Sequence, residues 1–149
     1  MKIPLFITTQ ISTEKETIKD GLHESFYKNG QLKFRGNYKD GKRDNLWEWF
    51  YENGQPKQRG NYKDGKRDGL WKVFDFTSNN NPFVLHGPIE TRGNYKKEEQ
   101  DGLWECFYEN GQLLEMGNYK DGEQHGLWEY FDESGNLTKT EEWEDGELI

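Results

Sequence analysis

The chain has few of the residues on which catalytic sites and membrane anchors commonly depend. Its 149 residues include one cysteine, three histidines and four prolines. A single cysteine, Cys106, excludes an intramolecular disulfide and fits either a reducing compartment or a protein that is indifferent to redox conditions. No stretch approaches the roughly 20 apolar residues of a membrane span. The apolar run at residues 1–7 has no small-residue cleavage site behind it. We therefore expect a cytoplasmic protein, or a surface or secreted one if a leader preceded residue 1.

Aliphatic residues are also scarce, but aromatic residues are not. Only 31% of the chain is hydrophobic, and the mean hydropathy of −1.21 by itself favours disorder. Yet 15% of the residues are aromatic, with six Trp, eight Tyr and nine Phe. Because these rings recur at fixed spacing, they indicate an ordered thin sheet or solenoid whose neighbouring units bury each other.

Charge is distributed unevenly along the chain, whose net charge is −8. Residues 1–100 hold 18 Lys and Arg against 14 Asp and Glu, whereas residues 101–149 hold 2 against 14. The acidic balance makes nucleic acid an unlikely partner. The acidic segment 101–149 suits a basic protein, and the charge difference also permits head-to-tail self-association through sheet edges.

A unit of 24 residues accounts for most of the sequence. Five copies open at Asp20, Asp44, Asp68, Asp101 and His125, and the third copy carries nine extra residues. Such a period is typical of a repeat array. We expect a cap or lead-in over residues 1–19 and one array over 20–149. The copies span 20–43, 44–67, 68–100 with an insertion at 75–91, 101–124 and 125–149.

Each copy predicts a β-hairpin. In the second copy an aromatic run, 46–51, and a more polar run, 57–62, are of strand length. Asn53-Gly54 lies between them and Asp64-Gly65 follows. Both dipeptides favour two-residue hairpin turns in which both central residues have positive φ. The expected fold is therefore all-β, an open antiparallel meander of about ten short strands.

Alternation along the strands separates two faces. Leu46, Glu48 and Phe50 share one face, and the aromatic side chains share the other. The second strands carry a glycine two residues before a tyrosine, as in Gly60 and Tyr62. Since a strand glycine commonly marks close approach of a bulky group, we expect an aromatic ring of a neighbouring strand over each one.

Three elements recur in the repeat unit, seen in full as Asn-Gly at 53–54, Gly-Asn-Tyr-Lys-Asp-Gly at 117–122 and Gly-Leu-Trp-Glu at 126–129. Through these elements the repeat unit resembles the MORN repeat variant. The most similar arrays are bacterial YwqK-type proteins described as antitoxins. The resemblance implies a curved or twisted antiparallel sheet with one hairpin per repeat. It also implies binding of proteins or lipids, with no catalytic residues to transfer.

Chemistry-bearing residues form no recognised arrangement, so we predict no enzyme, no metal and no cofactor. His23 and His125 substitute for repeat residues, and His86 lies in the insertion without a second ligand at metal spacing. Cys106 has no local base and is most simply a small buried hydrophobe.

Three sets of residues are candidates for binding. The aromatic face is a candidate for a protein partner, and its residues are Trp47, Trp49, Tyr51, Trp71, Trp104, Tyr108, Trp128 and Tyr130. The insertion offers an apolar tip, Phe83, Val84, Leu85 and His86, which could instead cover exposed rings. Lys42, Arg43, Lys66 and Arg67 form a basic stripe for anions, or a solvated edge that prevents aggregation.

These patterns favour a non-enzymatic protein-binding module, for which the resemblance suggests an antitoxin or immunity protein that occludes a basic toxin. Two alternatives stay open. One is peripheral binding of anionic lipid or a phosphorylated ligand through the basic rim. The other is a structural scaffold that assembles with itself.

Overall fold

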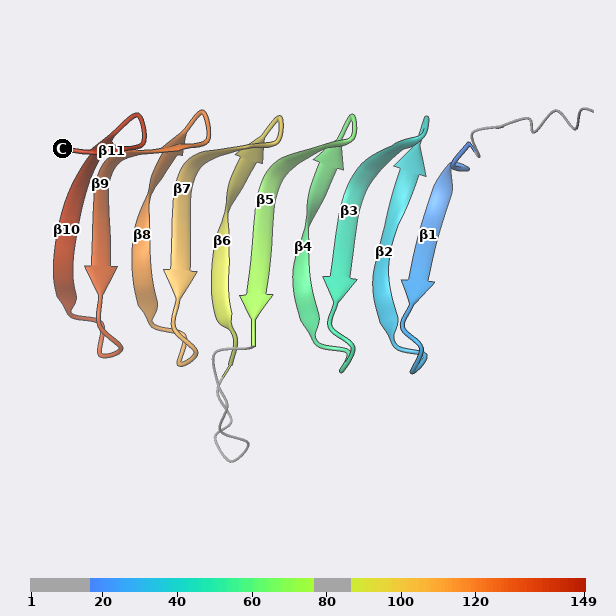
Figure 1. Ribbon diagram of the computed structural model, residues 1–149, viewed down its shortest axis with the longest axis horizontal. Helices are drawn as coiled ribbons and strands as arrows, with labels where there is room; N and C mark the ends of the chain where they lie inside the picture. Colours follow the sequence, from blue (N-terminus) through green and yellow to red (C-terminus); the bar gives the residue numbers. More distant parts are fainter. Residues whose placement is uncertain (1–16, 77–86) are drawn as a thin grey trace, which may run out of the picture.

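The computed structural model describes residues 17–76 and 87–149, which form one open antiparallel sheet (Figure 1). Its 11 strands lie side by side in chain order, each paired only with its neighbours in sequence. The strands are β1 (Gly21–Phe26), β2 (Leu32–Lys39), β3 (Lys42–Phe50), β4 (Pro56–Lys63), β5 (Lys66–Asp75), β6 (Ile89–Lys96), β7 (Glu99–Phe107), β8 (Leu113–Lys120), β9 (Glu123–Phe131), β10 (Leu137–Glu144) and β11 (Glu147–Leu148). The predicted all-β meander is confirmed, with β11 as a short additional strand.

Two-residue turns run along one end of the array, at the top of Figure 1. They connect β2 to β3, β4 to β5, β6 to β7, β8 to β9 and β10 to β11. In the turn at Asp40 and Gly41 both residues have positive φ, 51° and 72°, as the sequence predicts. Lys97 and Glu98 adopt the same conformation in the third copy without a glycine. Glu98 therefore holds φ 78°, a conformation that costs a non-glycine residue free energy.

The Asn-Gly turns at the opposite end differ from the prediction. Only the glycine has positive φ, as at Gly54, where φ is 87°. The asparagine uses its side chain instead, because Asn53 Oδ1 accepts a hydrogen bond from the Gln55 backbone N–H at 3.0 Å. This side-chain turn competes with the two-residue type that the dipeptide favours. The result is a longer connection, closed by the Tyr51 N–H donating to the Gln55 carbonyl at 2.8 Å.

Four tryptophans form the core of the sheet. Trp47, Trp71, Trp104 and Trp128 are the buried hydrophobic residues among those described, with 0–7% of their surface exposed. Each ring lies over a glycine of the preceding copy, so that a Cβ on Gly36 or Gly60 would overlap Trp47 or Trp71. The predicted close approach of a ring to each of these glycines is confirmed.

Each indole is also held by a polar contact and by neighbouring rings. The Trp47 Nε1–H donates to the Asn37 carbonyl at 3.0 Å, at a point where the β2–β3 register shifts. Tyr38 packs edge-on against Trp47 at 5.0 Å between ring centroids. The same hydrogen bond recurs from Trp71, Trp104 and Trp128 to the carbonyls of Asn61, Asn94 and Asn118. The core is therefore one arrangement used four times.

The face opposite the tryptophans is more exposed and carries the predicted Leu, Glu and Phe residues. Leu46 on β3 is 47% exposed. Arg35 forms an ion pair with Glu48 at 2.6 Å, and its guanidinium lies 6.0 Å from the centre of the Phe50 ring. Arg92 repeats the arrangement with Glu105 at 2.9 Å and with Phe107. This side of the single layer therefore combines ion pairs with partly exposed leucines.

The insertion is described only at its ends. β5 extends to Asp75 and β6 begins at Ile89, and these two residues pair across the strands. The predicted insertion therefore includes residues that belong to paired strands. Its apolar tip, Phe83, Val84, Leu85 and His86, lies outside the described residues, and so does most of the predicted cap at 1–19.

Replacing Gly60 by Ala should destabilise the sheet by about 2–3 kcal/mol, because the added methyl would overlap the buried Trp71 ring. Urea unfolding followed by tryptophan fluorescence measures the change. Asn61→Ala, at an exposed position next in the strand, is the control. Equal unfolding midpoints for the two variants would contradict the packing role of Gly60.

Candidate functional site

The tryptophan face has a buried row and a variable row. The buried row contains the four core tryptophans and the glycines opposite them. Beside it, consecutive cross-strand partners form a second row whose side chains differ from copy to copy. This variable row consists of Phe34, Trp49, Gln58, Val73, Thr91, Cys106, Glu115, Tyr130 and Lys139. Because its members are half-buried or exposed, it is the part of this face that can offer different chemistry at each copy.

The predicted aromatic binding residues therefore fall into three groups. Four of them, Trp47, Trp71, Trp104 and Trp128, are almost fully enclosed by the sheet's own packing and leave a partner little surface. Trp49 and Tyr130 belong to the variable row and are half-buried. Tyr51 and Tyr108 lie near the Asn-Gly turns. Partner binding by the set stays a prediction, and the geometry favours the variable row.

Tyr51 and Tyr108 connect neighbouring copies. The Tyr51 hydroxyl donates to the Phe74 carbonyl at 2.9 Å, and the Tyr108 hydroxyl donates to the Phe131 carbonyl at 2.8 Å. Tyr27 makes the equivalent bond to Phe50 at 2.8 Å. These half-buried rings thus have a structural role that the sequence pattern did not reveal.

The predicted basic stripe divides between the two sides of the sheet. Arg43 lies on the tryptophan face, 4.6 Å from the ring centre of Trp47 and 5.4 Å from that of Trp49. Its Nη1 donates to the Tyr62 hydroxyl at 3.0 Å. Burial lowers the pKa of Arg43, but hydrogen bonds to Tyr38 and Tyr62 outweigh it, so the pKa is raised overall. Arg43 is therefore a firmly charged part of the aromatic cluster.

Arg67 occupies the equivalent place one copy later. Its guanidinium lies 4.1 Å from the centre of the Tyr95 ring and 5.9 Å from that of Trp71. It also forms an ion pair with Glu98 at 2.6 Å. Both arginines of the predicted stripe thus already have partners within the protein.

The lysines of the stripe line a groove at the Asp-Gly end of the array. The groove has a volume of about 530 Å³. It is lined by Lys42, Lys63, Asp64, Lys66, Asp68, Lys96 and Lys97. Lys39 pairs across the strands with Lys42, and Lys63 pairs with Lys66. Like charges in such positions are unfavourable, and the later copies replace them with Lys–Glu pairs at Lys96–Glu99 and Lys120–Glu123.

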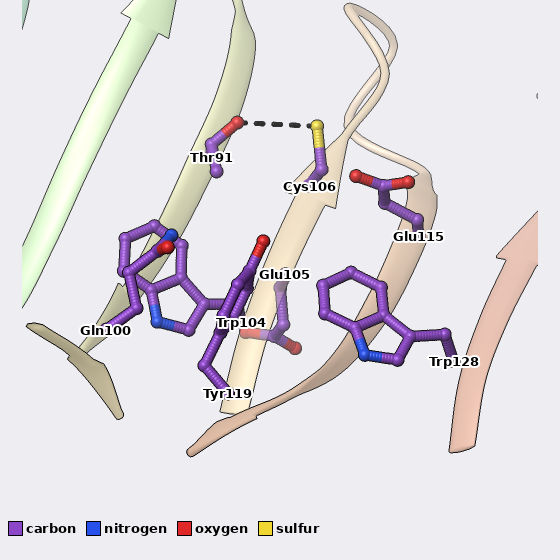
Figure 2. A pocket seen from close by; sticks show the side chains of 8 residues that line it. All are labelled: Thr91, Gln100, Trp104, Glu105, Cys106, Glu115, Tyr119 and Trp128. Carbon is purple, nitrogen blue, oxygen red and sulfur yellow. Dashed lines mark hydrogen bonds between the residues drawn. The ribbon is translucent and has the colours of Figure 1, made fainter. Parts of the chain in front are cut away.

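A smaller cavity lies on the tryptophan face where the charge has become acidic (Figure 2). Its volume is about 90 Å³. The lining residues are Thr91, Gln100, Trp104, Glu105, Cys106, Glu115, Tyr119 and Trp128. In Figure 2 the ring of Tyr119 stands between the indoles of Trp104 and Trp128, with Glu115 close to Trp128. We call this space the Cys106 cavity.

Cys106 and Glu115 are neighbours across β7 and β8. Burial raises the pKa of the Cys106 thiol, and Thr91 Oγ1 donates to Cys106 Sγ at 3.4 Å. The thiol is consequently a weak nucleophile at neutral pH. Burial also raises the pKa of Glu115, and the negative charge of Glu141 adds to the effect.

Glu115 and Gln100 were missed by the sequence reasoning. Comparison of the copies in the sequence could have indicated both. Glu115 stands where the second and third copies have Gln58 and Thr91, and Gln100 stands where the first and second have Arg43 and Arg67.

The histidines and metal ligands give no catalytic arrangement within the described residues. His23 takes a tryptophan position on β1, where its ring packs on Tyr38 and its Nε2 lies 2.6 Å from the Lys19 carbonyl. His125 Nδ1 lies 4.0 Å from Asp145. Over residues 17–76 and 87–149, no group of three or more His, Cys, Asp or Glu side chains could hold a metal ion. None of the described residues belongs to a helix able to cross a membrane.

The comparison with known families agrees with this architecture. A model of the MORN repeat variant matches residues 19–40, 43–64, 100–121 and 124–148, more than half of the chain. The chain belongs to the MORN repeat variant family. Repeats of this family are non-enzymatic modules that bind proteins or membranes. The match leaves out residues 65–99, which include the insertion, and no curated protein matches the chain.

Replacing Glu115 by Gln should stabilise the fold at pH 7, because the raised pKa means that the folded state disfavours the ionised carboxylate. Below the ordinary glutamate pKa of about 4.3 both states are protonated, so the gain should disappear. Urea unfolding at pH 7 and pH 3.5 (about one unit lower than that pKa) measures this difference. Glu129→Gln, on the opposite face, controls for the loss of one charge. A gain that is equal at both pH values would contradict the explanation.

Proposed function

We propose that this MORN array is a non-enzymatic module that binds a basic protein on the tryptophan face of its fourth and fifth copies. In the version that the family resemblance favours, the protein is an antitoxin or immunity protein, and its partner is a toxin whose active surface it occludes. The single observation that carries the proposal is the variable row. It presents a different side chain at every copy and carries an acid at Glu115, within a segment, 101–149, that has 14 acidic and 2 basic residues.

The physical basis is a rigid surface of suitable composition. Buried indoles fix the backbone, so the variable row is held in place before a partner arrives, which lowers the entropic cost of binding. Aromatic groups with acidic neighbours are common at protein interfaces, and complementary charge accelerates association and selects the partner. The described residues offer no acid, base and nucleophile set that would compete with this function.

Neutralising the acidic part of the tryptophan face should weaken capture of a basic partner by about tenfold or more. The double variant Glu115→Gln with Glu141→Gln tests this in co-expression with neighbouring genes, followed by co-purification and a toxicity assay. Glu129→Gln with Glu142→Gln removes the same charge from the opposite face and should leave capture unchanged.

Two results would contradict the proposal. One is the absence of a stable partner and of any relief of toxicity from the unmodified protein. The other is an equal loss of capture in both double variants, which would indicate a general charge effect. Sedimentation of the unmodified protein at low and high salt separates partner binding from association between copies of this chain.

The lysine groove supports a second candidate function, binding of a phosphorylated headgroup at a membrane surface. The observation in its favour is that lysines face each other across neighbouring strands in two places, as the register partners Lys39–Lys42 and Lys63–Lys66. A bound polyanion would relieve the repulsion of these like charges. The two arginines, which already have partners, are not needed for it.

Replacing Lys42, Lys66 and Lys96 by Gln should abolish binding to vesicles that contain anionic phosphoinositides at low salt, and raising the salt should weaken binding of the unmodified protein steeply. Replacing Lys28, Lys33 and Lys57, near the Asn-Gly turns, is the matched control. Co-sedimentation with vesicles measures both. Equal binding by the two triple variants would refute a groove-specific site.

A further inference from the structure

The second and third copies show how this sheet accommodates a guanidinium group. Arg43 reaches from the start of β3 across the tryptophan face and lies between the rings of Trp47, Trp49 and Tyr62. Its contact with the Tyr62 hydroxyl fixes the orientation of the group. Arg67 repeats the placement against Trp71 and Tyr95. The last residue of one copy thus supplies a cation to the rings of the next copy, a favourable cation–π arrangement.

The fourth copy keeps the rings but not the cation. Trp104 and Tyr119 correspond to Trp47 and Tyr62, and their ring centroids lie 5.8 Å apart. Gln100, the last residue of the third copy, stands at the position that Arg43 and Arg67 hold in the two earlier copies. It hydrogen-bonds to Tyr119 and carries no charge. Cys106 stands where the second copy has Trp49, so a large ring is replaced by a small side chain. Both replacements are smaller side chains, and both line the Cys106 cavity, whose volume is about 90 Å³.

A carboxylate has been added beside this space. Glu115 replaces the neutral Gln58 of the second copy, and it lines the cavity. It forms no hydrogen bond or ion pair with any residue in the ranges 17–76 and 87–149. The nearby acids are already engaged, since Glu105 pairs with Arg92 at 2.9 Å and Glu141 accepts from the Tyr130 hydroxyl at 2.7 Å. Its raised pKa agrees with a half-buried carboxylate that lacks a cation.

We propose that the Cys106 cavity receives an arginine side chain of a partner protein, which replaces from outside the cation that Arg43 and Arg67 supply within the chain. The proposal rests on the protein-binding function above and names the group that is recognised. The planar guanidinium can stack on Tyr119, as Arg67 does on Tyr95, while donating two hydrogen bonds to Glu115. A lysine ammonium is a point charge that lacks the stacking plane, so arginine should be preferred.

Hexa-arginine and hexa-lysine peptides at 150 mM salt (a Debye length of about 8 Å) are suitable probes, because long-range attraction is then screened. NMR spectra of the indole N–H groups report the location of binding. We expect hexa-arginine to shift the signals of Trp104 and Trp128 more than those of Trp47 and Trp71, and to bind more tightly than hexa-lysine. Glu115→Gln should weaken hexa-arginine binding about tenfold, and Glu129→Gln should have little effect.

A second variant tests the geometry without removing a charge from Glu115. Gln100→Arg with Cys106→Trp rebuilds the arrangement of the second copy and should fill the cavity, so hexa-arginine should no longer shift Trp104. The single variant Gln100→Arg provides an internal cation with less change in volume and should weaken binding in the same direction. Unchanged peptide binding in both variants would overturn the proposal, as would equal losses in Glu115→Gln and Glu129→Gln.

The outcome also separates this proposal from the broader one. A captured partner protein that binds the filled-cavity variant as tightly as the unmodified chain would overturn arginine recognition and leave protein binding intact. Specific hexa-arginine binding in the cavity, together with no captured partner and no relief of toxicity, would support the cavity and overturn the antitoxin function.

Discussion

The contact between a tryptophan ring and the glycine of the preceding copy is the constraint on which the rest of the sheet depends. A single-layer sheet has no second layer to bury its apolar surface, so it must form a core within its own thickness. The indole does this by lying flat on a backbone that has no side chain. At about 25 cal/mol per Å², burying roughly 200 Å² of ring contributes about 5 kcal/mol per copy before entropic costs. Four such contacts hold the described array.

The glycine pattern and the Asp-Gly turns were predictable because each is set by local geometry. Gly60 could be assigned a close neighbour from its place in a strand, and Asp64-Gly65 favours one turn type strongly. The Asn53-Gly54 connection was not, because the Asn53 side chain competes with the backbone for the same hydrogen bond. The turn at Lys97 and Glu98 was also not predictable from its own residues. The pairing of β6 with β7 on either side imposes positive φ on two residues that do not favour it.

The candidate site was harder to predict. The alternation of side chains along a strand assigns each residue to a face of the sheet, but it does not show how deeply the side chain is buried. Trp47 and Trp49 share a face in the sequence pattern, yet one is enclosed and the other half-buried. Arg43 and Lys42 are adjacent in sequence, but one lies on aromatic rings and the other lines a groove. Glu115 is a candidate because of its surroundings, aromatic rings without the cation that the earlier copies have, and these depend on the fold. Differences between copies, read position by position, were the signal that could have indicated it.

The position of Glu141 has a consequence for the length of the array. It pairs across the strands with Trp128 at the point where the earlier copies have Gly36, Gly60, Gly93 and Gly117. The ring of a sixth copy would have to lie flat on this residue, and its side chain occupies that space. Adding a copy after the fifth one would therefore require a glycine at position 141, whereas duplicating an internal copy, which carries its own glycine, would not.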